Sequence, residues 1–489
     1  METEFTASRA PVAPLGDGKA AQLPAAKPGE PAARLSLWDA VSIIIGIVIG
    51  ATIFRSPPMI FGNVENPGTG LAIWALCGLL SLIGALCYAE LASTYPRMGG
   101  DYVYLTRAFG PWVGFLFGWA QLAAILTASI GSMAFVFADY AVQLWGLDPD
   151  WTAPLAAAAV LALTATNFLG VVLSKWAQNL LTLAKLVGLG AIIWAGFSAP
   201  HGDAWQVTSP VGPAGLGTAM IIVLYAYGGW NDAAFVAAEL RKRRNIAVAL
   251  ILGTTAVTLT YLVVNLAYIS GLGFEGVRAS TAVAADVLGR AWPGTGNQIM
   301  CVLVMVSALG AINGLIFAGS RVYAALGRDH PAFGRLGRWH PTLGSPIGAL
   351  AAQAVVALLM TAAVGTDYGR GMIDKLLTYC RTETVDWGRL GGGFGAMLAV
   401  TAPPFWAFFL LTGISLFVLR QRDSGLERPF KVRFFPELPM VFCAMCVYMV
   451  YQSVVWAGRL TIFVAILVLL GVPLYRLSER LRTGRWSSE

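Results

Sequence analysis

Long apolar stretches alternate with short polar ones along most of the chain. After Leu37, twelve apolar stretches follow one another, each bounded by charged residues or by Pro and Gly. Most are close to the roughly 20 residues that an α-helix needs to cross a bilayer. The pattern predicts an all-α polytopic membrane protein with about 12 transmembrane helices, near residues 38–60, 69–92, 111–140, 152–172, 177–198, 213–238, 246–272, 297–326, 345–364, 400–420, 437–457 and 460–476.

The polar remainder divides the chain. Residues 1–36 are rich in Ala, Pro and Gly, lack the apolar core of a signal peptide, and are expected to form a disordered cytoplasmic tail. Residues 37–476 form the predicted transmembrane domain and residues 477–489 a cytoplasmic C-terminal tail. Residues 365–399 are polar, rich in Gly and too long for a tight turn. They are expected to form an external excursion between spans nine and ten, either a lid or an insertion without a role.

Composition and charge narrow the class of protein. Hydrophobic residues make up 57% of the chain and charged residues only 12%, which excludes a soluble enzyme. The net charge of +7 raises the question of nucleic acid, but 24 of the 33 Lys and Arg residues fall on the N-terminal side of the predicted membrane, 8 on the other side, and Lys185 within a span. Cytoplasmic loops carry such an excess. Both termini are therefore predicted to be cytoplasmic, and no nucleic acid partner is expected.

Two spans contain internal breaks. Span one carries Gly46 and Gly50 in a strongly apolar run that Pro57 and Pro58 end, and span six carries paired glycines at 228 and 229. Spans one and six correspond if spans 1–5 and 6–10 are inverted repeats, which leaves two C-terminal helices outside the 5+5 repeat. A break at membrane depth is tolerated where it is buried in protein or lines a cavity. The alternative is that these glycines serve only close helix packing.

Broken helices expose backbone groups that suit a zwitterion. One side of each break presents free N–H groups and a positive dipole end, and the other presents free C=O groups. These groups complement a carboxylate and an ammonium respectively, as in transporters that bind substrate at discontinuous helices. The breaks therefore indicate a secondary transporter for a small zwitterion.

Several motifs resemble one known family. They are the segments Ile49-Gly-Ala-Thr-Ile-Phe, Tyr88-Ala-Glu-Leu, Tyr95-Pro-Arg-Met-Gly-Gly, Tyr225-Ala-Tyr-Gly-Gly-Trp-Asn, Tyr261-Leu-Val-Val-Asn, Ser307-Ala-Leu-Gly-Ala-Ile-Asn and Arg428-Pro-Phe-Lys-Val. In their order and spacing the chain is similar to the amino acid/polyamine/organocation (APC) superfamily of permeases, and most of all to its L-type amino acid transporter-like branch.

The resemblance implies specific substrate contacts. It assigns the substrate carboxylate to backbone amides of the triplet at 50–52, the amine to carbonyls near both breaks, an aromatic gate to span six, and a side-chain pocket position to span eight. An interhelical polar contact is the alternative for the last of these. The residues so assigned are Gly50, Ala51 and Thr52, then Val48, Ile49, Ala226 and Gly228, then Tyr225, and finally Asn313.

Two positions depart from the family pattern. The third triplet residue, normally Gly, is Thr52, whose β-branched side chain restricts the backbone and occupies volume beside the proposed carboxylate. Either its hydroxyl replaces a backbone donor, or the substrate is not a standard α-amino acid. Ala311 stands where some relatives carry a large aromatic residue, which favours a roomier pocket.

Lys185 is a charged residue inside an apolar span, which costs about 2.5–3.5 kcal/mol on insertion scales. In the family, a lysine of span five takes the place of the sodium ion of sodium-coupled relatives. The resemblance therefore implies that Lys185 bridges spans one and eight near Ser307. It is expected either to carry a proton during transport or to remain a fixed charged bridge in an exchanger.

The remaining polar residues receive structural interpretations. Asp139 and Asp232 are expected near span ends, and Glu90, Asp101 and Glu239 in salt bridges that help to close the inner gate. We expect no metal site, no cofactor and no ATP-binding loop. The loop after span three, Gly146-Leu-Asp-Pro-Asp-Trp, lacks the cysteine through which animal L-type light chains bind a heavy chain, so no disulfide-linked heavy chain is expected.

The sequence thus favours a sodium-independent amino acid permease that works by exchange or proton symport in a bacterial inner membrane. Its partners would be an amino acid, the lipid bilayer and, for a symporter, protons. A polyamine or organic cation carrier and a non-transporting amino acid sensor are the alternatives. A membrane enzyme is disfavoured because no nucleophile–base pair or metal cluster is visible.

Overall fold

The computed structural model describes residues 34–198, 204–207, 215–242, 244–388, 390 and 392–486. Nearly all of the tail predicted for residues 1–36 lies outside this part. Within it, twelve helical stretches are long and apolar enough to cross a membrane, which confirms the predicted all-α polytopic fold. In chain order they are α1–α2 (Leu37–Val48, Thr52–Arg55), α4 (Pro67–Thr94), α6–η1–α7 (Pro111–Ala120, Gln121–Ile125, Leu126–Trp145), η2–α8 (Pro149–Trp151, Thr152–Phe168), α9 (Val171–Ser198), α10–η3 (Leu216–Ala226, Trp230–Glu239), α11 (Arg244–Leu272), α14 (Gly296–Asp329), α15 (Ile347–Gly365), α17 (Gly392–Arg422), α18 (Glu437–Ala457) and α19–α20 (Leu460–Leu469, Gly471–Trp486).

The first span begins at a strong helix start signal. Ser36 caps α1 by accepting a hydrogen bond from the Asp39 amide, and the Asp39 carboxylate accepts one from the Ser36 amide. This reciprocal capping satisfies backbone donors that a helix start leaves free. The Asp39 carboxylate also bonds Asn179 and Lys175 of α9. The cap therefore fixes both where α1 begins and which helix it packs against.

Both predicted interruptions are present. Helix α1 ends at Val48, three residues follow in irregular conformation, and the short α2 begins at Thr52. Helix α10 ends at Ala226, and the 3-10 helix η3 begins at Trp230. Gly229 between them has φ +106°, and a Cβ there would lie 2.6 Å from Ile47 Cγ2. The second break therefore requires glycine because of its backbone conformation and because it packs against the first.

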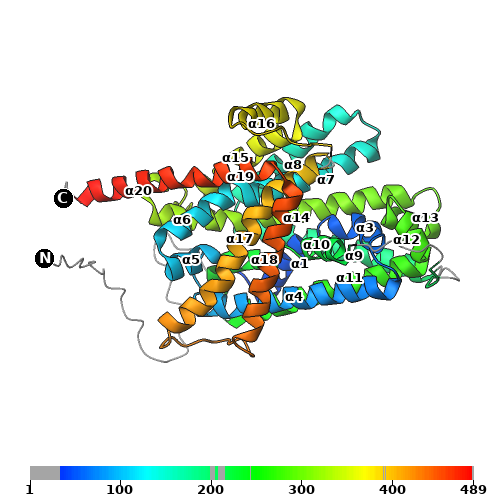
Figure 1. Ribbon diagram of the computed structural model, residues 1–489, viewed down its shortest axis with the longest axis horizontal. Helices are drawn as coiled ribbons and strands as arrows, with labels where there is room; N and C mark the ends of the chain where they lie inside the picture. The colour runs from blue at the N-terminus through cyan, green and yellow to red at the C-terminus, as the bar shows by residue number, and fades with distance from the viewer. Residues whose placement is uncertain are drawn as a thin grey trace.

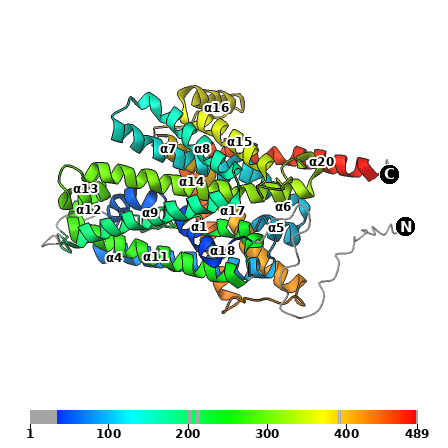
Figure 2. The same cartoon turned by 180° about the vertical axis from the view of Figure 1, so that it is seen from behind.

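The two broken spans lie within a group of long helices. Helix α1 packs against α9, α11 and α14, and η3 packs against α1, α11 and α14. Figure 1 shows α4 and α11 running together below α14 along the long axis of the molecule. From behind, α9 lies near α14 and α11 and covers α1 (Figure 2). This surrounding protein accounts for unwound backbone in an otherwise apolar core.

The ends of the two broken spans are tied together by backbone. Leu35, just before α1, pairs with Leu240, just after η3, in a parallel bridge. The Leu35 amide donates to Glu239 O at 2.9 Å, and the Arg241 amide donates to Leu35 O at 3.1 Å. These bonds join the start of the first span to the end of the sixth.

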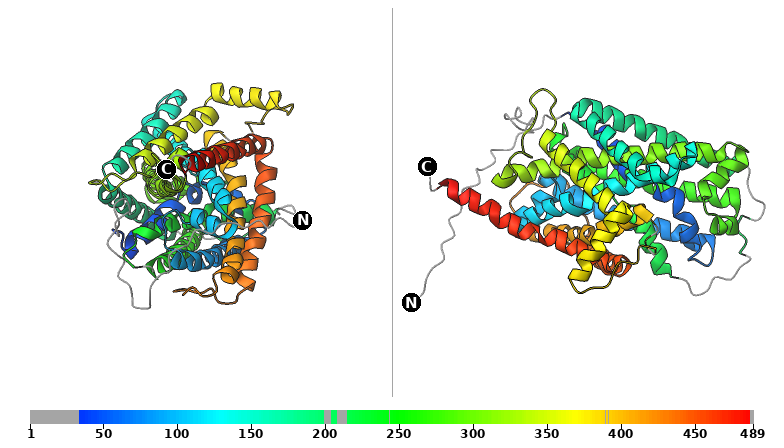
Figure 3. Two further views of the ribbon diagram at one scale, coloured as in Figure 1. Left: turned by 90° about the vertical axis from the view of Figure 1, so that its left-hand side faces the viewer. Right: turned by 90° about the horizontal axis from the view of Figure 1, so that it is seen from above.

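The segment between spans nine and ten contains a helix of its own, α16 (Asp367–Tyr379), capped by the Thr366 hydroxyl. It buries Gly369, Ile373 and Leu377 along one face and lies at the periphery of the fold (Figure 3). Helix α17 begins at Gly392, within the expected excursion, so the last part of 365–399 is helical. At the other end of the chain, α20 continues through Trp486 and extends beyond its neighbours in the right-hand view of Figure 3.

Candidate substrate site

A cavity of about 120 Å³ lies between the two breaks. It is bounded by both broken spans together with parts of η1, α7, α14 and α17. Ala311, which stands where some relatives carry a large aromatic residue, also lines the cavity, and its small side chain leaves room there. Six of the proposed substrate-binding residues line the cavity, namely Val48, Gly50, Thr52, Tyr225, Ala226 and Gly228.

The first break leaves donors without backbone acceptors. The Gly50 amide turns back to Val48 O at 2.8 Å. The next two amides, those of Ala51 and Thr52, have no backbone acceptor among the bonds of the described residues. Such groups at a helix start bind an anionic ligand well. Two of the three amides assigned to a carboxylate therefore lack a backbone acceptor, and of these two residues Thr52 lines the cavity.

Lys185 and Ser307 bond the carbonyl groups that the first break exposes. Lys185 is fully buried, and its Nζ donates to Gly46 O at 2.8 Å and to Ile49 O. The Ser307 hydroxyl donates to Ile49 O at 3.0 Å and Gly50 O at 3.3 Å. Because the Gly50 amide bonds Val48 O, no helical N–H meets the Gly46 carbonyl. Lys185 replaces that missing donor.

The geometry at Lys185 changes the roles expected of two neighbours. The Ile49 carbonyl, expected to face a substrate amine, faces Lys185 and Ser307 instead, and neither Ile49 nor Ala51 lines the cavity. Gly46 serves the close approach of α9, since a Cβ there would lie 1.9 Å from Gln178 Nε2. The packing alternative therefore applies to Gly46, while Gly50 lines the cavity.

Asn313 does not line the cavity. It is fully buried, and its side-chain amide accepts a hydrogen bond from Asn167 Nδ2 and donates to Gln178 Oε1 and Ser174 O. These bonds join α14 to α8 and α9. The interhelical polar contact considered as the alternative for Asn313 is what the structure contains.

Tyr261 of α11 is a residue that sequence reasoning did not assign to the site. Its hydroxyl lies 2.9 Å from Val48 O and 3.1 Å from Ala226 O, so one side chain joins the ends of α1 and α10. Both carbonyls were expected to receive the substrate amine. The motif containing Tyr261 was recognised, but an apolar helix pattern gives no rotational position for one hydroxyl.

The cavity also contains an acidic side chain. Asp232, expected near a span end, lines the cavity although only 5% of its surface is exposed. Its hydrogen-bond partner is the Asn231 amide at 3.0 Å. Gln121, in the π-helical turn η1, also lines the cavity, and its Oε1 has no hydrogen-bond partner among the described residues. The sequence signal available for Asp232 was its position three residues after the paired glycines at 228 and 229.

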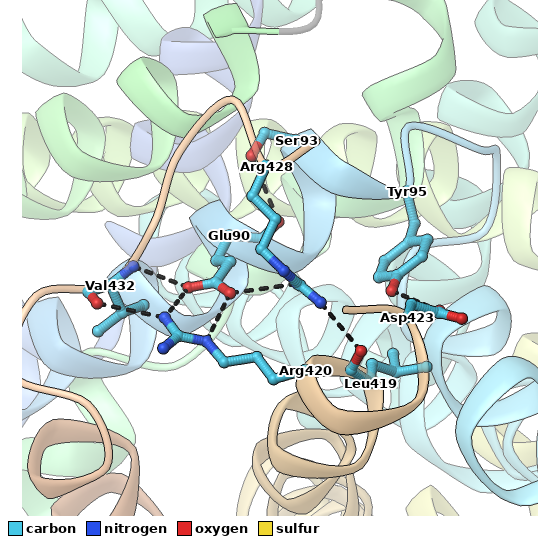
Figure 4. A network of polar contacts seen from close by, with 8 residues as sticks. All are labelled: Glu90, Ser93, Tyr95, Leu419, Arg420, Asp423, Arg428 and Val432. Carbon is cyan, nitrogen blue, oxygen red and sulfur yellow. Dashed lines mark hydrogen bonds and ion pairs between the residues drawn. The ribbon is translucent and has the colours of Figure 1, made fainter. Parts of the chain in front are cut away.

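Elsewhere, the buried carboxylates of Glu90 and Glu239 pair with arginine. Glu90 of α4 receives Arg420 Nε at 2.8 Å, Arg420 Nη2 at 2.5 Å, Arg428 Nη1 at 3.2 Å and the Val432 amide at 2.7 Å. These four residues, the Glu90 network, tie α4 to the end of α17 and the segment that follows (Figure 4). Glu239 pairs with Arg321 at 2.7 Å. The salt bridges expected for Glu90 and Glu239 are thus present.

The prediction that Asp101 forms a salt bridge is wrong. Its carboxylate accepts hydrogen bonds from the Tyr88 and Thr412 hydroxyls instead of pairing with a cation. Burial raises the pKa of Asp101 to about 6, although the bonds from Thr412 and Tyr88 act in the opposite direction. Near the Glu90 network, burial alone would raise the pKa of Asp423, but hydrogen bonds from Arg107 and Tyr95 hold it below its usual range.

Comparison with known proteins gives one consistent result. Residues 35–474 match a family model described as "Amino acid permease". The chain is 31% identical to the human b(0,+)-type amino acid transporter 1 over 86% of its own length and 82% of the relative. It is 30% identical to the human large neutral amino acids transporter small subunit 2 over 90% and 79%, and 29% identical to the human cystine/glutamate transporter over 91% and 85%.

Proposed function

Because the chain belongs to the amino acid permease family and is an amino acid transporter, we propose that it works without sodium, by exchange or proton symport, through alternating access at the central cavity. The observation that carries this proposal is the cavity itself, which lies between two broken helices. Transporters of this kind place their substrate where helix ends expose backbone charge.

The proposed binding mode places the two ends of the amino acid at the two kinds of backbone group. The carboxylate accepts hydrogen bonds from the amides of Ala51 and Thr52, which lack backbone acceptors. The amine donates to Val48 O and Ala226 O, which share the Tyr261 hydroxyl. Tyr225, whose hydroxyl lies 3.3 Å from Leu398 O, would open and close the path from the α17 side.

Sodium independence is supported by Lys185. Unwound carbonyls near a break are the ligands that coordinate a coupling sodium ion in transporters with discontinuous helices. Here the carbonyls of Gly46 and Ile49 hold the Lys185 ammonium group instead. A fixed charge gives an exchanger, whereas a lysine that releases its proton during the cycle gives a symporter. Lys185→Met would leave carbonyls without donors in both cases.

Uptake into proteoliposomes tests the proposal. Purified protein should accumulate labelled amino acids when unlabelled amino acids are present inside, or when a proton gradient is imposed, and sodium should have no effect. Gly50→Val should abolish this uptake without loss of expression, because the added methyl groups enter the cavity beside Met133. The control is Gly190→Val, since a Cβ at Gly190 meets no atom within 4 Å. Uptake that survives Gly50→Val would overturn the proposed site.

The orientation and surroundings of the chain are part of the proposal. The Lys and Arg distribution supports a topology with both termini in the cytoplasm, with 1–36 and 477–489 as tails, 37–476 as the transporter domain and 365–399 as an external excursion. A bacterial inner membrane fits a chain that works alone. The loop from Gly146 to Trp151 contains no cysteine, which supports a transporter without a disulfide-linked heavy chain. Labelling of cysteines introduced at either terminus would test the orientation.

Two alternatives remain as outcomes of the uptake experiment. A polyamine carrier would not need amides that bind a carboxylate, and uptake of a diamine without amino acids would identify it. A sensor would bind amino acids without flux. Among the described residues no group of His, Cys, Asp and Glu could hold a metal ion.

A further inference from the structure

Asp232 is one of two buried carboxylates, with Asp101, for which the described residues supply no opposite charge. The described residues contain five buried acidic side chains, Asp39, Glu90, Asp101, Asp232 and Glu239. Three of them pair with a lysine or arginine, and Asp101 accepts hydrogen bonds from two hydroxyls. Asp232 has only the neutral amide of its neighbour Asn231 at 3.0 Å. A buried carboxylate without a cation is unfavourable, and either a bound proton or a cation from outside the fold relieves the cost.

Asp232 faces the central cavity, so a cation bound in the cavity would pair with it. Asp232 lines the same cavity as Gly50, Thr52 and Ala226. One of its oxygens accepts the Asn231 bond, and the other makes no hydrogen bond within the described part of the chain. The open oxygen therefore belongs to the cavity rather than to a contact between helices.

The helix type sets the distance from the break. The Asp232 amide donates to Gly229 O at 3.2 Å, a bond of the 3-10 kind. In such a helix, residues three apart lie one above the other, and each residue rises about 2 Å. Asp232 thus lies on the same face as Gly229 and roughly 6 Å further along the axis. That is comparable with the extended side chain of a basic amino acid.

The surroundings of Asp232 suit a group with several hydrogens to donate. The Gln121 side chain lines the cavity, and its Oε1 has no partner in the described residues. The hydroxyls of Ser129 and Thr401 donate to backbone carbonyls, which leaves their oxygens free to accept. Lys185 is directed to Gly46 and Ile49 and does not reach this acceptor group.

Building on the proposed amino acid transport, we propose that Asp232 binds the side-chain ammonium or guanidinium group of a basic amino acid, and that the carrier's substrates are lysine, ornithine and arginine. The α-carboxylate and α-amine occupy the breaks, and the side chain extends along η3 to Asp232. A neutral amino acid would leave the Asp232 charge uncompensated, whereas a basic one neutralises it. Charge-assisted hydrogen bonds are the stronger class.

The test compares labelled lysine with labelled leucine in proteoliposomes. Wild-type protein should take up lysine, and Asp232→Asn should lower the lysine-to-leucine uptake ratio roughly 10- to 100-fold. Asp139→Asn is the matched control, because Asp139 is an exposed carboxylate on α7. It should keep the wild-type ratio.

A second variant uses the length of the side chain. Asp232→Glu keeps the charge and extends it by one methylene, so it should retain basic substrates and shift preference from lysine to the shorter ornithine. If Asp232→Asn does not fold, Asp232→Glu still tests whether Asp232 binds the substrate side chain. Unchanged preferences in both variants would overturn the inference.

Other outcomes separate this inference from the proposed function. Leucine uptake without any lysine, ornithine or arginine uptake would refute the role of Asp232 and leave amino acid transport intact. Proton-driven leucine uptake that Asp232→Asn abolishes would also refute it, because the carboxylate would then carry a proton. Absence of flux for every amino acid would refute the proposed function itself.

Discussion

Glu90 and Asp232 are both carboxylates buried in the same chain, yet their surroundings are opposite. Glu90 receives two arginines and a backbone amide, all from residues far away in the sequence (Figure 4). Asp232 receives one neutral amide from the adjacent residue and faces a cavity. A fully paired charge fixes the helices that supply its partners. A charge left open is available to a molecule that enters and leaves.

The comparison makes Glu90 the residue whose loss should destabilise the protein most. Glu90→Gln leaves Arg420 and Arg428 near each other without a counter-charge, and removal of one partner from a buried pair costs about 3–5 kcal/mol. We expect a correspondingly lower unfolding temperature in detergent. Glu437→Gln, which changes an exposed carboxylate at the start of α18, is the control. An unchanged unfolding temperature in Glu90→Gln would break the contrast.

The contrast can also be removed by giving Asp232 a partner inside the protein. Gln121→Lys places an ammonium group in the same cavity. It should reduce lysine uptake by roughly 100-fold, because an internal cation competes with the substrate and repels it, and it should not lower thermal stability. Gln121→Leu removes one acceptor without adding charge and should reduce lysine uptake only several-fold, the effect of one lost hydrogen bond. Equal loss in both variants would show that cavity shape, not charge, decides.

Tyr261 offers a change that should affect all substrates alike. Tyr261→Phe removes the hydroxyl between Val48 O and Ala226 O, with an expected loss of about 0.5–1.5 kcal/mol for the hydrogen bond. Uptake assays should show a KM several-fold higher for lysine and leucine, with their ratio preserved. A selective loss of lysine would mean that Tyr261, rather than Asp232, recognises the side chain.

The smallest expected effect concerns a paired carboxylate near the surface. Hydrogen bonds from Arg107 and Tyr95 hold the pKa of Asp423 below its usual range, so this pair stabilises the protein above the unfolded pKa and loses that effect as pH falls through the folded value. Because Arg107 is about a third exposed, the contribution is about 0.2–1 kcal/mol. Asp423→Asn should therefore lower the unfolding temperature slightly at pH 7 and less at pH 4. A larger difference at pH 4 would contradict the sign.

Local sequence features predicted much of this structure. Apolar length gave the twelve spans, and glycines in spans one and six gave the two breaks. A lysine in an apolar span is conspicuous, and Lys185 lies at the first break, as the resemblance implied. These features are readable because each depends on a few neighbouring residues.

Other features depend on how helices face one another. The Ile49 carbonyl turns to Lys185 rather than to the cavity, and Asp101 meets the Thr412 hydroxyl rather than a cation. Asp232 reaches the cavity because η3 is a 3-10 helix, whose tighter winding changes which residues share a face. Hydrophobic periodicity sets neither the rotation of a helix about its axis nor its winding.

The Tyr261 hydroxyl moves on a much shorter timescale than the helices around it. Its hydroxyl has one hydrogen and two carbonyl acceptors, Val48 O and Ala226 O, so at any instant at least one of them lacks the full hydrogen bond. The hydroxyl can alternate between them by rotation within nanoseconds, whereas helices that rock during transport move in microseconds to milliseconds. A substrate amine would donate to both carbonyls at once, so neither would lack a donor while the helices move.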